Sequence, residues 1–307
     1  MIRYRSGVWD SERWRSFSAR TGDIIISSPP KSGTTWTQVI CALLIFRRTT
    51  FDQSLDLISP WLEMQTRKIS DVIADLDAQQ HRRFIKSHTP LDGLPNDDAV
   101  TYICVGRDPR DVAISWAHHS DNINLEALFT ARDRAVGNED LAEMYRDRTP
   151  APTEPLARFW RWVDDSTADQ LSHANLASTM HHLATFWEAR ERPNVVLVHY
   201  ADLLSDLEGE MRRIAQRLDI DIDENILPSL VAAAGFEAMR ERADELAPDS
   251  SQGILQSNRA FFHTGHHVQW KDLLDLTDRR RYAQRVQQLA PTDLIEWVHR
   301  GPVIFDD

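Results

Sequence analysis

The sequence predicts an α/β fold: a single domain with a central parallel sheet flanked by helices. Three observations predict it. The run Ile24-Ile25-Ile26 is β-branched and continuous, as in a strand buried on both faces of a parallel sheet. Further short apolar runs alternate with helical patterns along the chain, and polar or cationic residues follow directly after these runs. Ligands of open parallel sheets bind at the carboxyl ends of the strands, so we expect the site there.

The first strand is followed by a turn that suits an anion. Ser27 to Pro30 stop the strand, and an apolar helix is predicted to follow Gly33. A strand, tight turn and helix aim backbone N–H groups and the positive helix end at one point. Gly33 permits close backbone approach, Thr34 and Thr35 offer hydroxyl groups, and Lys31 adds a mobile charge. The alternative is an ordinary turn with a surface lysine.

A second strand, Arg83 to Lys86, ends at Ser87-His88-Thr89-Pro90. A histidine with a pKa near neutrality is a natural base for taking a proton from an alcohol or phenol. His88 is therefore a candidate general base. The alternative is a solvated histidine at a strand end.

A third strand, Val100 to Val105, leads into Gly106-Arg107-Asp108-Pro109, and Pro109 suits the first turn of a helix. A metal-dependent phosphotransferase would place a metal-binding aspartate at such a strand end. Here Arg107 and Ser115 are spaced to hold one anion directly. The alternative is a structural ion pair of Arg107 with Asp108.

The rest of the chain completes the predicted fold. Residues 118–185 are expected to form a helical or irregular insertion over the acceptor site, within one domain spanning 1–307. A fourth strand is predicted over 194–200 and an amphipathic helix over 203–218. Further helices are expected from about residue 278.

Composition excludes some functions. Lys and Arg number 35 against 47 Asp and Glu, a net charge of −12, which argues against nucleic-acid binding. Cys41 and Cys104 lie in apolar runs, which predicts two core residues without a disulfide bond. This pattern fits a protein of a reducing compartment. The N-terminus shows no signal-peptide core and no apolar run reaches membrane-spanning length. We therefore expect a cytoplasmic protein without stable membrane insertion.

Three segments resemble motifs of one family. P-K-S-G-T-T-W (30–36), K-S-H-T-P (86–90) and V-G-R-D-P-R-D-V-A-I-S-W (105–116) are similar, in this order, to motifs of the cytosolic sulfotransferases. The first is not the Walker sequence, since its lysine precedes the glycine. The resemblance implies a P-loop-like phosphosulfate site for 3′-phosphoadenosine-5′-phosphosulfate (PAPS), with 3′-phosphoadenosine-5′-phosphate (PAP) as product.

The resemblance also implies roles for single residues. His88 would be the base, and Lys31 and Lys86 would stabilise charge on the transferring group and the leaving phosphate. The residues implied in nucleotide binding are Lys31, Ser32, Gly33, Thr34 and Thr35 at the 5′-phosphate, Arg107 and Ser115 at the 3′-phosphate, and Trp36, Phe236 and Tyr200 at the adenine.

The chain departs from the family pattern near its end. The motif R-K-G-x-x-G-x-W appears as H-T-G-H-H-V-Q-W over 263–270, so His263 and Thr264 stand before Gly265 where two cations are usual. His263, with a charge that titrates, is the candidate for the missing cation at the 3′-phosphate, and Arg259 is the competitor. The histidines at 263, 266 and 267 also allow a metal site, although no matching acidic or cysteine partner is evident. A dimerisation motif of the family is poorly matched from Lys271 onward, which leaves the oligomeric state open.

The sequence thus predicts a PAPS-dependent sulfotransferase that acts in-line, without a metal, on a hydroxyl of a small, partly apolar acceptor. One alternative is a P-loop-type small-molecule kinase, which would need Mg²⁺ and a strand-end aspartate. The other is a non-catalytic nucleotide-binding protein, which would have no use for Lys86 and His88 beside the phosphate loop. The acceptor itself is not identified by the sequence.

Overall fold

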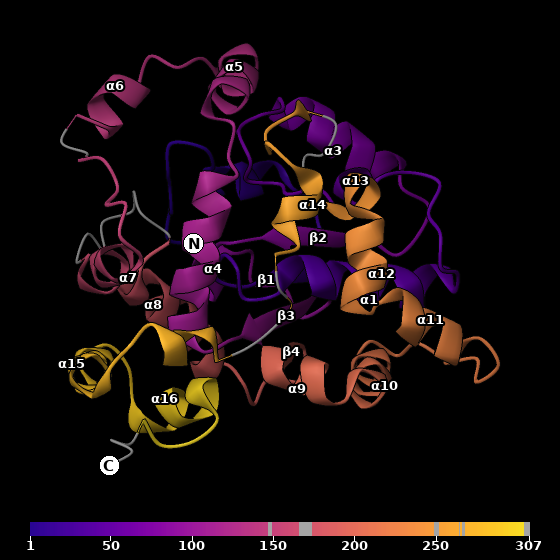
Figure 1. Ribbon diagram of the computed structural model, residues 1–307. Helices are drawn as coiled ribbons and strands as arrows, with labels where there is room; N and C mark the ends of the chain where they lie inside the picture. Colours follow the sequence, from indigo (N-terminus) through magenta and orange to yellow (C-terminus); the bar gives the residue numbers. More distant parts are fainter. Residues whose placement is uncertain (147–148, 166–173, 249–251, 264, 266–267, 304–307) are drawn as a thin grey trace.

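A parallel sheet of four strands forms the centre of the computed structural model (Figure 1). The structure describes residues 1–146, 149–165, 174–248, 252–263, 265 and 268–303. The strands lie in the order β2-β1-β3-β4, which confirms the predicted parallel α/β sheet. They are β1 (Ile24–Ser27), β2 (Phe84–Ser87), β3 (Thr101–Gly106) and β4 (Val195–His199).

The chain reverses its direction of travel across the sheet at β1. It passes from β1 outward to β2 and then returns to β3 on the other side of β1. Ile24 pairs with Phe84 on one side and with Thr101 on the other, so the three strands begin level and β1 and β2 end level, while β3 runs on to Gly106. This is the switch point at which open α/β sheets bind ligands.

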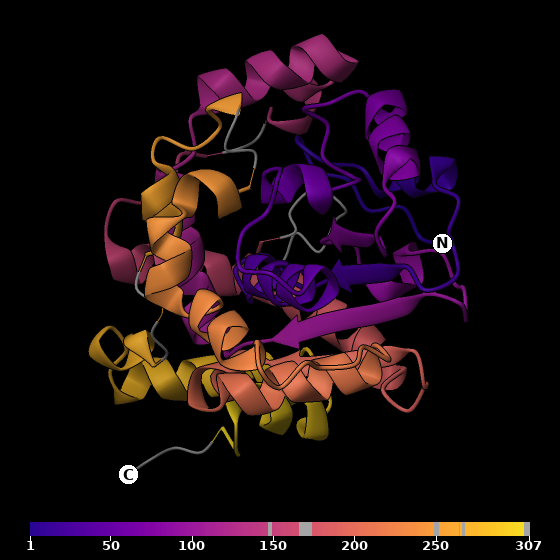
Figure 2. The ribbon, with the colours of Figure 1, turned by 90° about the vertical axis from the view of Figure 1, so that its right-hand side faces the viewer.

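Helices cover both faces of the sheet, as the two views show (Figures 1 and 2). Ile24 and Ile26 face a core shared with α1, α9 and α10, whereas Ile25 faces a core shared with α7, α8, α15 and α16. All three isoleucines are fully buried, as the β-branched run predicts. The helices are α1 (Thr34–Phe46), α2 (Leu55–Ile58), α3 (Ile69–Ala78), α4 (Pro109–Asp121), α5 (Leu125–Val136), α6 (Leu141–Met144), α7 (Pro155–Asp164), α8 (Leu176–Glu188), α9 (Tyr200–Ser205), α10 (Leu207–Arg217), α11 (Leu227–Ala233), α12 (Phe236–Glu241), α13 (Ala243–Leu246), α14 (Asn258–Phe261), α15 (Leu276–Gln287) and α16 (Thr292–His299).

The stretch 118–185, expected to be helical or irregular, holds α5, α6, α7 and most of α8. One expectation about helices needs correction. The helix predicted over 203–218 is interrupted at Asp206, whose non-helical backbone ends α9 and whose side chain caps α10 by accepting from the Gly209 N–H at 2.9 Å. Because capping satisfies helix-end donors, Asp206 favours this break over one continuous helix.

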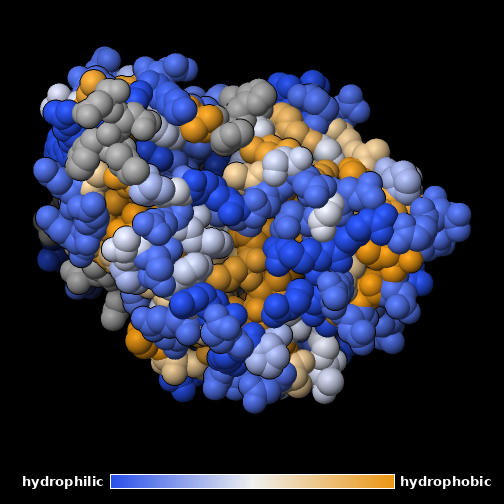
Figure 3. Space-filling model, turned by 90° about the horizontal axis from the view of Figure 1, so that it is seen from below, coloured by the Kyte–Doolittle hydropathy of each residue, from blue (hydrophilic) through white to orange (hydrophobic). Residues whose placement is uncertain are grey.

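The outer surface is mostly polar. In Figure 3 hydrophilic residues cover most of the face seen from below, with apolar residues grouped in its middle and at the right. No helix in the described parts of the chain has both the length and the apolar character needed to cross a bilayer.

Candidate functional site

The loop between β1 and α1 is shaped for an anion. Lys31 and Gly33 both adopt left-handed backbone conformations, with φ of 69° and 119°. The first N–H groups of any helix have no intrahelical partner. In α1, which begins at Thr34, no capping side chain accepts from them either. A Cβ at residue 33 would lie 3.1 Å from Cδ2 of Tyr200, so glycine is required by both φ and space. The sequence therefore builds a narrow cradle of backbone donors at the end of β1.

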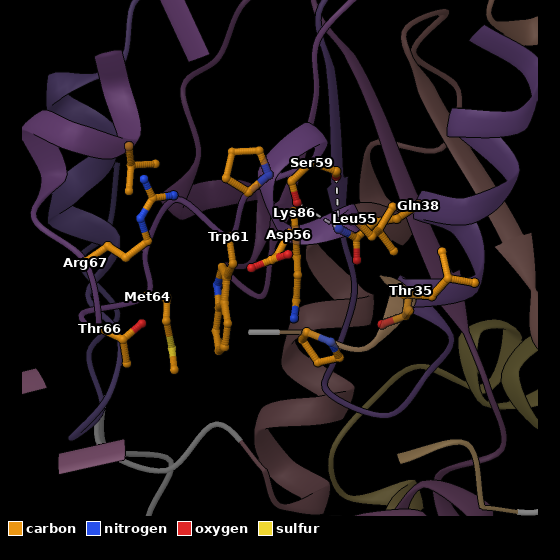
Figure 4. A pocket seen from close by; sticks show the side chains of 14 residues that line it. Thr35, Gln38, Leu55, Asp56, Ser59, Trp61, Met64, Thr66, Arg67 and Lys86 are labelled. Atoms are coloured by element: carbon orange, nitrogen blue, oxygen red, sulfur yellow. Dashed lines mark hydrogen bonds between the residues drawn. The ribbon is translucent and has the colours of Figure 1, made fainter. Parts of the chain in front are cut away.

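Three cations meet at this cradle. Arg107, which follows β3, donates from Nη1 to the Lys31 carbonyl oxygen at 3.0 Å. Lys86, the third residue of β2, places its Nζ 4.4 Å from the ring centroid of Trp61, and the two side chains run side by side in Figure 4. Burial, and then the charges of Arg107 and Lys86, lower the pKa of Lys31 to about 7. An anion placed here would relieve that repulsion.

A second, small pocket is lined in part by Lys86. It has a volume of about 30 Å³, enough for one water molecule, and Figure 4 shows Gln38, Asp56, Ser59 and Arg67 around it. Its size excludes a nucleotide or an acceptor.

His88 is held with a defined tautomer. Its Nδ1 lies 2.6 Å from the Ser28 carbonyl oxygen, which can only accept, so Nδ1 carries the proton and Nε2 carries the lone pair. The ring is 8% exposed and packs edge-on to Trp61 with centroids 4.9 Å apart. In its neutral form His88 therefore presents Nε2 as the proton acceptor that a general base needs.

The residues on either side of His88 are fixed by one buried carboxyl group. Oε1 of Glu63 accepts from Ser87 Oγ, from Thr89 Oγ1 at 2.6 Å and from Trp14 Nε1 at 2.7 Å. Burial raises the pKa of Glu63, although these three hydrogen bonds oppose that rise. Glu63 thus orders the loop that presents His88.

A cavity of about 660 Å³ opens from this cradle. Part of its lining is polar and comes from the residues at the carboxyl ends of β1, β2 and β3. Apolar side chains of the N-terminal segment, residues 61–64, α4, α5 and the 254–262 segment form another part, and two of them, Phe261 and Trp61, pack on Lys31 and Lys86. The apolar wall comprises Val8, Trp9, Trp61, Met64, Trp116, Ile123, Leu125, Leu128, Phe129, Ile254, Leu255, Phe261 and Phe262.

Aromatic residues form a third region of the cavity. Trp36 packs edge-on to Tyr200 with centroids 5.4 Å apart and donates from Nε1 to the Ala234 carbonyl oxygen at 2.9 Å. Gly265, with φ of 64°, lies against the ring of Phe236, since a Cβ there would come within 2.5 Å of Cδ2. The three aromatic residues predicted from the sequence therefore border one space, suited to a planar base.

The late segment is attached to α4 through Asp111. Its two carboxylate oxygens accept from the backbone N–H groups of Val268, at 2.7 Å, and Gln269, at 2.9 Å. His263 stacks on His118 of α4, with centroids 3.8 Å apart. Burial, and then the neighbouring His118, Lys31 and Arg240, lower the pKa of His263. His263 is thus brought to the cavity.

The structure brings most of the predicted site residues together. Those that line the cavity are Lys31, Gly33, Thr34, Thr35, Trp36, Lys86, His88, Arg107, Ser115, Tyr200, Phe236, His263 and Gly265. Ser32 differs: its side chain is fully buried and its Oγ has no hydrogen-bond partner among the described residues. Thr264, His266 and His267 lie outside the described residues. Within the described residues, no cluster of three metal-ligating side chains occurs.

Sequence reasoning missed several residues that border or support the site. Trp61 packs on both Lys86 and His88, Glu63 orders the His88 loop, and His119 and Phe261 line the cavity. For His119 a signal was present, because it follows Ser115 by four residues and so lies on the same face of the predicted helix. Phe261 carried no such local signal.

Comparisons with known proteins point to one family. A family model described as a sulfotransferase domain matches residues 21–297. A glycolipid sulfotransferase of Mycobacterium bovis is 42% identical over 312 residues, covering 99% of this chain and 95% of that protein. Among solved structures, a mouse sulfotransferase complexed with PAP has a TM-score of 0.68 at 18% identity, covering 94% of this chain and 92% of that one. Retinol dehydratase in complex with androsterone and PAP gives 0.67 at 20%, covering 89% and 82%.

Proposed function

The chain belongs to the sulfotransferase domain family, and from this premise we propose that it transfers a sulfuryl group from PAPS to a hydroxyl of an acceptor with a large apolar part. The observation that carries the proposal is one cavity that is lined both by cations and a helix N-terminus and by a large apolar wall. His88 lines the same cavity as both.

The residues present fit the donor. The cradle at Gly33 and the N-terminus of α1 suit its 5′-phosphosulfate, and Lys31 adds charge there. Arg107 and Ser115 suit its 3′-phosphate, with His263 beside them. Trp36, Tyr200 and Phe236 suit the adenine. When bound, PAPS supplies the sulfuryl group and a phosphate leaving group.

The chain's own residues account for the reaction. Nε2 of His88 accepts the proton of the acceptor hydroxyl while the acceptor oxygen forms its bond to sulfur. The bond between sulfur and the phosphate oxygen breaks, and its electron pair goes to the phosphate. Lys31 and Lys86 stabilise the charge that moves onto these oxygens, a role for which a kinase recruits Mg²⁺. We therefore propose that no metal is needed.

The apolar wall supports a lipid-like acceptor. A cavity of about 660 Å³ shared between a nucleotide and an acceptor leaves room for part of a hydrocarbon chain against α5 and the 254–262 segment. The 42% identical mycobacterial relative is named for glycolipid acceptors. We propose a glycolipid or a related hydroxyl-bearing lipid for this chain.

Calorimetric titration tests the donor against the kinase alternative. We expect PAP to bind in the presence of EDTA and more tightly than ATP with Mg²⁺. Tighter binding of ATP with Mg²⁺, or PAP binding that EDTA abolishes, would refute the proposed donor and the proposed independence from metal.

A further inference from the structure

One polar side chain stands out on the apolar wall of the cavity. His119 lies in the last turns of α4, four residues after Ser115, so both project from one face of the helix into the same cavity. Phe261 packs edge-on to its ring at 5.8 Å, and Trp116 lies 5.5 Å away.

The ring nitrogens of His119 have no hydrogen bond within the described chain. Nδ1 is buried and unpaired. A buried polar atom of this kind costs free energy, and in a site it is commonly satisfied by a ligand. Because the ring borders the cavity, a molecule bound there is the partner available to it.

His119 is neutral and lies close to the chemistry. Burial lowers its pKa well below the ordinary value, and the charges of Lys31, Lys86 and His88 lower it further. A neutral imidazole offers one donor and one acceptor. Such a group fits a hydroxyl, which has both, better than it fits a hydrocarbon or an anion.

We propose that His119 recognises a second hydroxyl of the acceptor, close to the one that is sulfated, and thereby selects sugar-bearing acceptors over simple alcohols. The inference rests on the sulfuryl transfer proposed above and assigns a specificity to one residue of that cavity. His88 accepts the proton of the reacting hydroxyl, whereas His119 forms hydrogen bonds with a neighbouring hydroxyl and accepts no proton from it. A hydrocarbon chain leaving the same sugar would lie along the α5 side of the wall.

Two acceptors with the same tail test this inference: octyl β-D-glucoside and 1-octanol, each with PAPS labelled with ³⁵S. His119→Phe keeps an aromatic ring but removes the hydrogen bonds. We expect it to lower kcat/KM for the glucoside about 10- to 100-fold, because a sugar hydroxyl would then be buried without a hydrogen-bond partner. The value for octanol, which has no second hydroxyl, should change less than about threefold. His119→Gln, which retains a donor and an acceptor, should restore part of the glucoside activity.

Leu128→Ala, which alters the same wall without touching a polar group, serves as the control and should affect both acceptors alike. If His119→Phe lowers both acceptors equally, or neither, the inference is wrong while the proposed function stands. If the wild-type protein sulfates neither acceptor but does sulfate other alcohols, the inference is again wrong. Failure to transfer label to any hydroxyl contradicts the proposed function itself.

Discussion

Arg107 holds Lys31 in place by donating from its guanidinium to the Lys31 carbonyl oxygen at 3.0 Å. This contact joins the loop after β3 to the loop after β1, so the two predicted phosphate sites share one rigid frame. It also keeps a permanent positive charge beside the Lys31 ammonium. Burial, and then this charge and that of Lys86, lower the pKa of Lys31 to about 7.

Nucleotide affinity should therefore depend on pH through Lys31. Its pKa is about 7 in the free protein, and a bound phosphate favours the charged form and raises that pKa. Below pH 7 Lys31 is already charged, so PAP should bind most tightly there. As pH rises above 7, binding requires proton uptake and affinity should fall. Dissociation constants measured from pH 6 to pH 9 check this.

Two variants separate Lys31 from other groups that titrate. Lys31→Met should weaken PAP binding at pH 6 and reduce the slope above pH 7, leaving the part that His263 contributes. Lys271→Met, on the 3-10 turn Gln269–Asp272 and outside the cavity lining, should retain the wild-type profile. A wild-type dissociation constant that stays flat from pH 6 to pH 9 would show that Lys31 does not face the nucleotide.

His263 should supply a titrating charge where relatives of this family carry a cation. Burial, His118, Lys31 and Arg240 lower its pKa in the free protein, and a doubly charged phosphate should raise it. His263→Arg should therefore tighten PAP binding more at pH 8 than at pH 6. If Arg259 holds the phosphate instead, Arg259→Ala will weaken binding strongly and the effect of His263→Arg will not vary with pH.

His88→Ala should lower kcat by about 10²- to 10⁴-fold, as expected for loss of a general base. PAP affinity should stay near that of the wild type, because the variant leaves the α1 cradle intact. His81→Ala, which removes a ring packed on Phe46 rather than one in the cavity, is the control and should turn over normally. Wild-type turnover by His88→Ala would exclude the role of base.

Glu63→Ala should destabilise the fold by about 2–4 kcal/mol, because it leaves the donors of Trp14, Ser87 and Thr89 buried and unpaired. Chemical denaturation measures the change in the free energy of unfolding. Glu12→Ala, which removes an exposed ion pair with Arg15, should change stability by less than about 0.5 kcal/mol. Equal effects of the two variants would contradict the structural role given to Glu63.

Much of the sheet, and the clustering of the proposed donor-site residues, was predictable because the sequence signals are local. The Ile24 run marks a doubly buried strand, and the P-K-S-G-T-T-W segment fixes turn, cradle and helix start within seven residues. The signal is also local for Arg107 and Ser115, because Arg107 directly follows β3 and Ser115 lies in the helix that comes next, α4.

Features that depend on distant contacts were not predictable in this way. Asn175 caps α8 in a capping box with Ser178, a signal masked by the charged composition around it. Glu63 gains its role only when β2 packs beside it, and Phe261 reaches Lys31, 4.1 Å from its ring centroid, only through the fold. Contacts between residues so far apart in the sequence cannot be inferred from the spacing of residues along the chain.

The central claim is tested most directly by a single-turnover reaction with ³⁵S-labelled PAPS, a glycolipid acceptor and excess EDTA. The account predicts a labelled sulfate ester on the acceptor and one PAP formed for each ester, with label transfer slowed in His88→Ala. Absence of labelled ester with glycolipids and with simple alcohols alike, or transfer of phosphate from ATP with Mg²⁺ to the same acceptors, would contradict it.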